Sequence, residues 1–368
     1  MPRGSANEQT GAALLASRLS YLGSDPCGGS EVVFWEDRDI LRRAGFPVRV
    51  YGRAAINGAP VEALPMHSEL PLLSSLEYCW RFIHKEPHSV VIGYNEPTVA
   101  GLAPRRSIIR FDWATPLPKY WRLPVWLNRF QHGLYLFPSN YERELFLRLH
   151  TLIRPETCVV LPNAVDLQLF RPAEQLCRSA QVGFAGQWSE GKGITHLLEA
   201  WSTVRRQLPG AELHLAGGTR LWKSVYDTPA TQAIHQRVED MAQGGMVRVI
   251  GERKRSEMPE FWRSVSVAAV PSLREAFGLV AIEAMACGVP VVASAVDGLK
   301  EVIVDGECGL LVPPSDPGKL AQALVTLLTD EPLRRRLAEG ARRRAEIFSL
   351  ESRSKAFLAL VAARTAKA

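Results

Sequence analysis

Long apolar stretches and paired cysteines are both missing from this chain of 368 residues. No run of 18 uncharged apolar residues occurs, which predicts that no helix spans a membrane. The six cysteines are scattered without a Cys-x-x-Cys pair, and the histidines do not cluster at metal-ligand spacing. We therefore expect free thiols in a reducing cytosol and no metal centre. The first ten residues hold no apolar stretch flanked by basic ones, so we expect no signal peptide and a cytoplasmic protein.

Strong net charge, internal repeats and low-complexity segments are also absent. The net charge of +6 is too small to indicate nucleic-acid binding, although it fits anionic substrates or a membrane surface. The dinucleotide-binding pattern Gly-x-Gly-x-x-Gly does not follow the first predicted strand, which argues against a nicotinamide-dependent dehydrogenase. With 46% apolar side chains, a chain of this length can form two domains that each have a core.

Short apolar runs alternate with helical patterns along the whole chain. Both halves show this alternation, which predicts two doubly wound α/β domains of the Rossmann type. We assign residues 1–172 to the first domain, 173–348 to the second, and 349–368 to a C-terminal helix. The predicted strands are 12–19, 48–51, 90–93, 108–111 and 134–138 in the first domain and 182–185, 211–216, 247–251, 265–270 and 289–294 in the second.

The most informative segment is 272–294, which holds two glutamates. Glu275 and Glu283 stand eight positions apart, across a Phe277-Gly278 turn that opens an apolar helix. If most of that span is helical, the two carboxylates are roughly 10 Å apart. The two carboxyl groups of a retaining glycoside hydrolase are about 5 Å apart, so the spacing argues against that class. It suits two acceptors that hold the opposite ends of an elongated, hydroxyl-rich ligand with an anionic middle. A nucleotide sugar has this shape.

Together with the run Ala-Met-Ala-Cys-Gly-Val-Pro that follows Glu283, this segment resembles the signature of the retaining GT-B-fold glycosyltransferases of family four. That family includes glycogen-synthase-like enzymes and lipid mannosyltransferases. The resemblance implies two Rossmann-like domains that face an interdomain cleft, with the helix 349–368 crossing back onto the first domain. It also implies that Glu275 contacts the hydroxyls of the donor sugar and that Glu283 holds the ribose hydroxyls. The other substrate-binding residues that we assign to this segment are Arg274, Phe277, Gly278 and Leu279.

The loop 182–193 carries a second part of the resemblance, because it is similar to the phosphate loop of the family. Lys192 stands at the family's lysine position and is expected to neutralise the departing diphosphate. Gln187 stands where the family has an arginine, so this substrate-binding position keeps a hydrogen-bond donor but loses a charge. Arg274 is a candidate replacement for that charge, and a solvent-facing role is equally consistent with the sequence.

In the first domain, the pair Gly28-Gly29 follows the first strand and opens the first helix. The family has a glycine pair at this place, where backbone N–H groups can bind a phosphate; an ordinary strand–helix turn is the alternative. After the fourth strand, where many relatives have a histidine, this chain has Phe111 and Asp112. We expect Asp112 to orient the sugar or the acceptor, or else to cap the segment that follows.

Aromatic and cationic side chains are interleaved in the segment 119–130. This pattern is typical of membrane interfaces, and it also fits an acceptor groove or a core-packing helix broken at Pro124. The first interpretation adds a peripheral contact with the inner face of the membrane to the expected cytoplasmic location.

The resemblance implies a glycosyltransferase that moves a sugar from a UDP- or GDP-sugar to a hydroxyl of a sugar, lipid-linked or other glycan acceptor, with retention of the anomeric configuration. Glu275, Lys192 and Asp112 are the residues that we assign to catalysis. We expect no cofactor and no metal, because no Asp-x-Asp pair falls in a predicted cleft loop. Two other functions stay open, namely a nucleotide-sugar epimerase of the same fold and a non-catalytic protein that binds sugar nucleotides.

Overall fold

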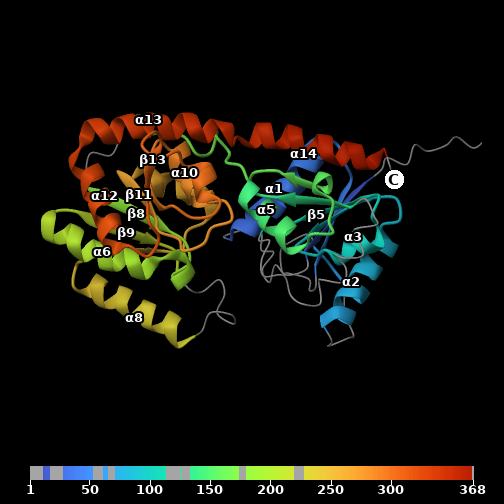
Figure 1. Cartoon of the computed structure of the whole chain (residues 1–368), viewed down its shortest axis with the longest axis horizontal. Coiled ribbons are helices and arrows are strands. Elements are labelled where there is room, and N and C mark those ends of the chain that lie inside the picture. The colour runs from blue at the N-terminus through green and yellow to red at the C-terminus, as the bar shows by residue number, and fades with distance from the viewer. Residues whose placement is uncertain are drawn as a thin grey trace, which may run out of the picture. The chain divides into compact units, whose positions relative to one another are not determined.

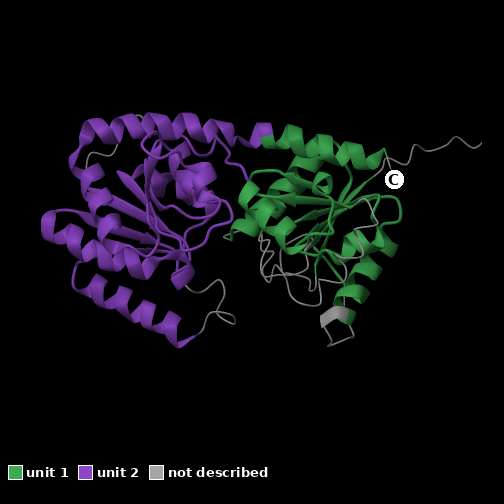
Figure 2. Ribbon diagram, viewed as in Figure 1, with its two compact units in different colours: residues 1–162, 353–368 green, residues 163–352 purple. Residues whose placement is uncertain are grey.

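The protein consists of two compact units, which Figure 2 draws in different colours. Unit 1 comprises Met1–Pro162 and Arg353–Ala368, and unit 2 comprises Asn163–Ser352. The segment 163–172, assigned to the first domain from the sequence, lies in unit 2 because Val165 and Phe170 are fully buried in the core of that unit. The computed structural model describes residues 11–16, 28–52, 61–64, 71–112, 125, 133–173, 180–218 and 228–366.

The described part of unit 1 is built around a seven-stranded parallel sheet of order β3-β2-β1-β4-β5-β6-β7, with helices on both of its faces (Figure 1). The strands are β1 (Ala12–Ala16), β2 (Val48–Gly52), β3 (Glu62–Ala63), β4 (Val90–Tyr94), β5 (Ser107–Arg110), β6 (Leu134–Phe137) and β7 (Cys158–Val160). The helices are α1 (Gly29–Arg43), α2 (Pro71–Lys85), α3 (Thr98–Leu102) and α5 (Asn140–Leu149), and a 3₁₀ turn covers Pro155–Thr157.

The central strands form from short runs of β-branched and aromatic residues without polar alternation. Every residue of β4, β5 and β6 is buried, which is the pattern of parallel strands covered on both faces. All five strands predicted for this domain occur, although residues 17–19 of the first lie outside the described part of the chain. β3 and β7 were not predicted, because runs of two and three residues carry no periodic signal.

Unit 2 has a six-stranded parallel sheet of order β10-β9-β8-β11-β12-β13 in its described part. The strands are β8 (Gln181–Ala185), β9 (Glu212–Ala216), β10 (Arg248–Gly251), β11 (Val267–Val270), β12 (Val291–Ser294) and β13 (Gly309–Val312). The helices are α6 (Ile194–Gln207), α8 (Pro229–Gln243), α9 (Met258–Arg263), α10 (Leu279–Ala286), α11 (Leu299–Val302), α12 (Pro317–Thr329) and α13 (Glu331–Ile347). Two 3₁₀ turns lie at Glu190–Lys192 and Arg255–Glu257.

Two hydrophobic clusters form the core of unit 2. One contains Trp262 of α9 and Met285 of α10, and the other contains Trp201 of α6 and Leu324 of α12. The five strands predicted for this domain all occur, and β13 is an addition. The prediction of two doubly wound α/β domains is confirmed.

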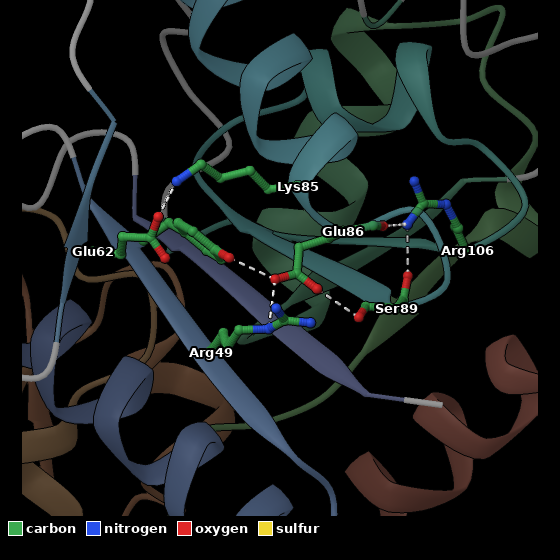
Figure 3. Close-up of polar contacts among 7 residues, drawn as sticks. Arg49, Glu62, Lys85, Glu86, Ser89 and Arg106 are labelled. Carbon is green, nitrogen blue, oxygen red and sulfur yellow. Dashed lines mark hydrogen bonds and ion pairs between the residues drawn. The ribbon is translucent and has the colours of Figure 1, made fainter. Parts of the chain in front are cut away.

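A buried glutamate ties the C-terminal end of α2 to the sheet of unit 1 (Figure 3). Glu86 accepts hydrogen bonds from the Tyr51 hydroxyl at 2.6 Å and the Ser89 hydroxyl at 2.7 Å. Arg49 Nε lies 2.8 Å from the same carboxylate, and Arg106 donates to the Glu86 and Ser89 carbonyls. Burial and the bond to Glu86 raise the pKa of Tyr51, which keeps the phenol a donor. Both carboxylate oxygens of Glu86 are thus satisfied, so the cluster stabilises the fold rather than offering a binding site.

The last helix, α14 (Leu350–Thr365), is held to unit 1 by a buried ion pair. The Arg353 guanidinium donates to one carboxylate oxygen of Asp37 in α1, and the Tyr94 hydroxyl donates to the other at 2.6 Å. Asp37 and Tyr94 are fully buried, and Arg353 is 4% exposed. Burial and the Asp37 charge raise the pKa of Tyr94, so the phenol stays protonated and continues to donate.

Candidate functional site

The predicted site residues of unit 2 lie at one edge of its sheet. β8 and β11 are neighbours, and the strand order reverses between them, since β9 and β10 follow on one side and β12 and β13 on the other. Open parallel sheets bind ligands beyond the carboxyl ends of the strands at such a reversal. The loops after β8, β11 and β12 meet there and carry Lys192, Glu275 and Asp297, respectively.

Lys192 and Glu275 form an ion pair at this edge. Lys192 Nζ lies 2.7 Å from Glu275 Oε2, and the Ser272 hydroxyl donates to the same oxygen at 3.3 Å. The Glu275 side chain is 13% exposed and the Lys192 side chain 32%. The pair is therefore partly shielded from water, which strengthens its electrostatic effect, and it is still open to a ligand.

The loops that carry these two residues approach each other closely. The Leu273 N–H donates to the Gly191 carbonyl at 2.9 Å. Gly193 has a φ of 69°, and a Cβ atom there would lie 1.9 Å from the Pro271 carbonyl oxygen. Only glycine fits this position, and its close approach brings Lys192 to Glu275.

α10 begins at this edge, directly after the turn at Gly278. Gly278 has a φ of 107°, and a Cβ there would lie 2.6 Å from a methyl carbon of Leu299, so the turn also requires glycine. The first-turn N–H groups of a helix favour an anion. The Phe277 ring is buried and packs edge-on against Phe348 at 5.4 Å, and Leu279 packs against the same core. These two side chains help to hold the turn in place, and their role in substrate binding stays a prediction.

Glu283 lies one turn further along α10 and is 7% exposed. Arg255 Nη1 lies 3.8 Å from Glu283 Oε1, and the Arg255 guanidinium lies 5.7 Å from the centre of the Phe170 ring. Arg255 was not predicted from the sequence; its signal is the basic run 253–255, which begins two residues after the end of β10. The arginine keeps a positive charge beside the Glu283 carboxylate.

Gln187 stands at the family's arginine position in the predicted phosphate grip, and Arg274 was predicted as a candidate to replace the missing charge. Gln187 Nε2 is buried and has no hydrogen-bond partner in the described part of the chain. Leaving such a donor unpaired costs about 1–3 kcal/mol, so an oxygen ligand at this place would be stabilising. The Arg274 side chain is 47% exposed, and its Nε lies 3.8 Å from Asp297 Oδ2. Arg274 therefore has a carboxylate beside it, and no role for the side chain of Asp297 was predicted from the sequence.

In unit 1, the glycine pair opens α1 as predicted, but one of its N–H groups is already used. The Gly28 N–H donates to the Glu31 carboxylate at 3.2 Å, and Gly29 is exposed. A carboxylate three residues after the start of a helix commonly binds back in this way. A phosphate at this helix terminus would have to displace Glu31 from Gly28 or bind beside it.

Asp112 lies just after β5 and forms a reciprocal pair with Asn95, which follows the neighbouring β4. Asn95 Nδ2 donates to Asp112 Oδ2 at 2.9 Å, and the Asp112 N–H donates to Asn95 Oδ1 at 3.0 Å. Arg110 Nε lies 3.9 Å from the other Asp112 oxygen. Asn95 has a φ of 54°, a left-handed conformation that asparagine tolerates better than most residues. The pair fixes Asp112 at the carboxyl edge of this sheet.

Two further expectations concern a metal and a membrane. Within the described ranges, no group of three or more His, Cys, Asp or Glu side chains lies close enough to hold a metal ion. No helix of those ranges is both long and apolar enough to cross a bilayer. The aromatic segment 119–130 lies outside the described residues except for Val125.

Comparison with known proteins identifies the family of the second half of the chain. The family described as glycosyl transferases group 1 matches residues 172–344, which include every site residue of unit 2 named above. Residues 172–344 are a glycosyl transferases group 1 domain. This domain corresponds to the part of the chain in which the two-glutamate segment was found.

The group 1 domain also has curated relatives. A D-inositol 3-phosphate glycosyltransferase of Stackebrandtia nassauensis is 35% identical over 216 residues, which cover 55% of this chain and 48% of the relative. An MMP alpha-(1->4)-mannosyltransferase of Mycolicibacterium hassiacum is 35% identical over 202 residues, which cover 54% of this chain and 47% of the relative. The matches thus span about half the length of these relatives.

Solved structures extend the likeness to the whole chain. Sucrose-phosphate synthase from Thermosynechococcus elongatus aligns with a TM-score of 0.78 at 23% identity, covering 95% of this chain and 98% of that one. The Anabaena protein HepE in complex with UDP aligns with a TM-score of 0.78 at 19% identity, covering 96% of this chain and 100% of that one. These likenesses, with the two parallel sheets, show that the chain has the GT-B fold. The group 1 domain is unit 2 of this fold, whereas Gly28 and Asp112 of unit 1 lie outside the family match.

Proposed function

We propose that the protein is a glycosyltransferase that moves a sugar from a UDP- or GDP-sugar to the hydroxyl of a glycan or lipid-linked acceptor, with retention of configuration and without a metal. The observation that supports this most is the Lys192–Glu275 ion pair at the carboxyl edge of the group 1 domain. It combines a cation for a diphosphate with a carboxylate for sugar hydroxyls. The names of the curated relatives support a sugar transferase, and the UDP or UDP-glucose bound by HepE supports a nucleotide-sugar donor.

The donor would lie across the start of α10. Glu275 precedes the helix, and Glu283 lies within it, so the two carboxylates would hold the sugar and the ribose at opposite ends. The diphosphate between them would face the helix N-terminus, whose dipole favours negative charge. Glu275 Oε2 is engaged by Lys192 and Ser272, and its Oε1 has no partner in the described part of the chain, which leaves that oxygen to accept from a sugar hydroxyl.

The chemical step breaks the bond between the anomeric carbon and the leaving phosphate oxygen, and the electron pair stays on the diphosphate. Lys192 and the N-terminus of α10 would stabilise this growing charge more than the charge of the bound donor. The acceptor hydroxyl would attack from the face that the phosphate leaves, which retains the configuration. Its proton would pass to the leaving phosphate oxygen, so the protein needs no separate base.

A ligand panel tests the function directly. We expect UDP or GDP, and the matching UDP-glucose or GDP-mannose, to raise the melting temperature, with slow donor hydrolysis in the absence of acceptor. Isomerisation of the donor without acceptor would indicate an epimerase instead. Tight binding with no turnover for any donor and acceptor would indicate a protein that binds sugar nucleotides without catalysis.

Removing the carboxylate of Glu283 should weaken nucleotide binding. We expect Glu283→Ala to weaken binding of UDP or GDP by about 1.5–3 kcal/mol, because it removes hydrogen bonds between the ribose and a charged group. Titration calorimetry measures the change, and Glu260→Ala, an exposed position on α9, is the matched control. Unchanged affinity in Glu283→Ala would remove this residue from the nucleotide site.

Chelation tests the proposed use of protein charges in place of a metal. Since Lys192 and the helix N-terminus would neutralise the diphosphate, transfer should proceed at an unchanged rate in excess EDTA. The assay compares initial rates before and after chelation, and after Mg²⁺ or Mn²⁺ is added back. Activity that disappeared with EDTA and returned with either ion would contradict this part of the mechanism.

A further inference from the structure

Asp297, in the loop after β12, has an unusual backbone conformation. Its φ of 38° lies in the left-handed region, where non-glycine residues are uncommon. Glycine would adopt this conformation with less strain, but glycine offers no side-chain acceptor. At this position Asp297 therefore provides a carboxylate acceptor that glycine would lack.

The Asp297 carboxylate binds the backbone of Glu275, the proposed sugar contact. Asp297 Oδ2 accepts the Glu275 N–H at 3.2 Å. The next residue, Gly298, donates its own N–H to the Glu275 carbonyl at 3.0 Å. A Cβ at position 298 would lie 2.2 Å from the Ala276 carbonyl oxygen, so only glycine allows this approach. Asp297 and Gly298 together hold the donor and the acceptor of the Glu275 backbone.

The side chain of Glu275 is held by other groups, one from the loop after β8 and one from its own loop. Lys192 and Ser272 both contact its Oε2, as described above. Because the backbone and one carboxylate oxygen are fixed from different loops, the direction of Oε1 is determined by both. Loss of either set of contacts would let the carboxylate move relative to a bound sugar.

The guanidinium of Arg274 lies beside the Asp297 carboxylate. The Arg274 Nε lies 3.8 Å from the same Oδ2 that accepts the Glu275 N–H, and the Asp297 side chain is only 13% exposed. A hydrogen bond to a charged acceptor is stronger than one to a neutral acceptor, so the Asp297 carboxylate is a strong acceptor for the Glu275 N–H.

We propose that Asp297 is a positioning residue, which fixes the Glu275 peptide so that the carboxylate stays aligned with the donor sugar. The inference rests on the proposed function, because it takes Glu275 as the sugar contact. Asp297 acts through Glu275 and does not itself touch the reacting atoms.

Three substitutions separate the acceptor, the charge and the backbone strain. Asp297→Ala removes the acceptor, Asp297→Gly removes it while relieving the strain, and Asp297→Asn keeps an amide oxygen in its place. We expect the first two to lower kcat about 10–100-fold, since displacements of about 1 Å at a reacting centre have effects of this size. Asp297→Asn should keep most of the kcat. Arg274→Ala spares the Glu275 N–H bond, so its kcat should lie between those of Asp297→Ala and Asp297→Asn. Affinity for UDP or GDP alone should stay within about twofold in the three Asp297 variants.

Glu275→Gln serves as the reference, and a double mutant shows whether Asp297 acts through Glu275. With UDP-glucose or GDP-mannose, adding Asp297→Ala to Glu275→Gln should cause no further loss of kcat. A steep loss in Glu275→Gln together with full activity in Asp297→Ala and Asp297→Gly would overturn the inference and leave the proposed function standing. Full activity in Glu275→Gln would overturn the proposed function, and the inference with it. Equal losses of UDP affinity and of kcat in Asp297→Gly would also overturn the inference, because they would indicate general damage to the site.

Discussion

Replacing Lys192 by alanine should lower kcat/KM for the donor by about two to three orders of magnitude, which corresponds to roughly 3–4 kcal/mol of transition-state stabilisation. Lys192 is the cation that lies against Glu275, and the family's second cationic position is occupied by Gln187. The variant would remove a charge that acts on the leaving diphosphate and would also leave the Glu275 carboxylate unneutralised beside it.

Steady-state kinetics with a matched control test this prediction. Lys319→Ala removes an exposed lysine of α12 whose side chain donates to Gln322 of the same helix, and it should leave kcat/KM unchanged. A double-mutant cycle of Lys192→Ala with Glu275→Gln separates the lost cation from the uncompensated carboxylate. If Lys192→Ala were as active as Lys319→Ala, the leaving-group role of Lys192 would be wrong.

Replacing Arg353 by alanine should have the largest effect on stability. The variant leaves the fully buried Asp37 carboxylate with the Tyr94 hydroxyl and without its ion-pair partner. Removing one partner of a buried ion pair typically destabilises a protein by about 3–5 kcal/mol. We expect this loss to appear as a lowered melting temperature of unit 1 and as detachment of α14.

Calorimetric melting measures the effect against a surface arginine. Arg335→Ala removes an exposed side chain of α13 that pairs with Glu331, and it should change stability by less than about 1 kcal/mol. The double variant Asp37→Asn with Arg353→Met removes both charges and should recover part of the loss. Melting of Arg353→Ala at the same temperature as Arg335→Ala would show that the buried pair does not hold the helix.

Much of the fold could be predicted because its signals are local. Uninterrupted apolar runs located the ten predicted strands, and the glycine at position 278 located the start of α10. The bond between Gly28 and Glu31 also has a local signal, since the glutamate follows three residues after the N-cap glycine of the helix. The strands β3 and β7 escaped because two or three residues are too few to show a period.

Several residues of the candidate site could be predicted from the sequence, but the contacts between them could not. The spacing of Glu275 and Glu283 pointed to both residues, yet it gave no indication that Lys192 would pair with Glu275 from another loop. Arg255 and the contact of Asp297 escaped for the same reason, because their partners, Glu275 and Glu283, lie in segments that follow another strand of the sheet. The motif predicts a ligand contact for Phe277 but does not show that its ring packs into the core against Phe348. Contacts of this kind depend on strand order, which a single sequence does not show.

The most direct test of the account measures the binding of a nucleoside diphosphate and of its sugar conjugate, UDP with UDP-glucose or GDP with GDP-mannose, to three forms of the protein. Titration calorimetry on the unmodified protein, Glu275→Gln and Glu283→Ala gives the affinity of each ligand. If the two glutamates hold opposite ends of the donor, Glu283→Ala weakens both ligands by a similar amount. Glu275→Gln then removes only the extra affinity that the sugar provides. Equal losses in both variants for both ligands, or loss of the sugar's contribution in Glu283→Ala alone, would contradict this assignment of the site.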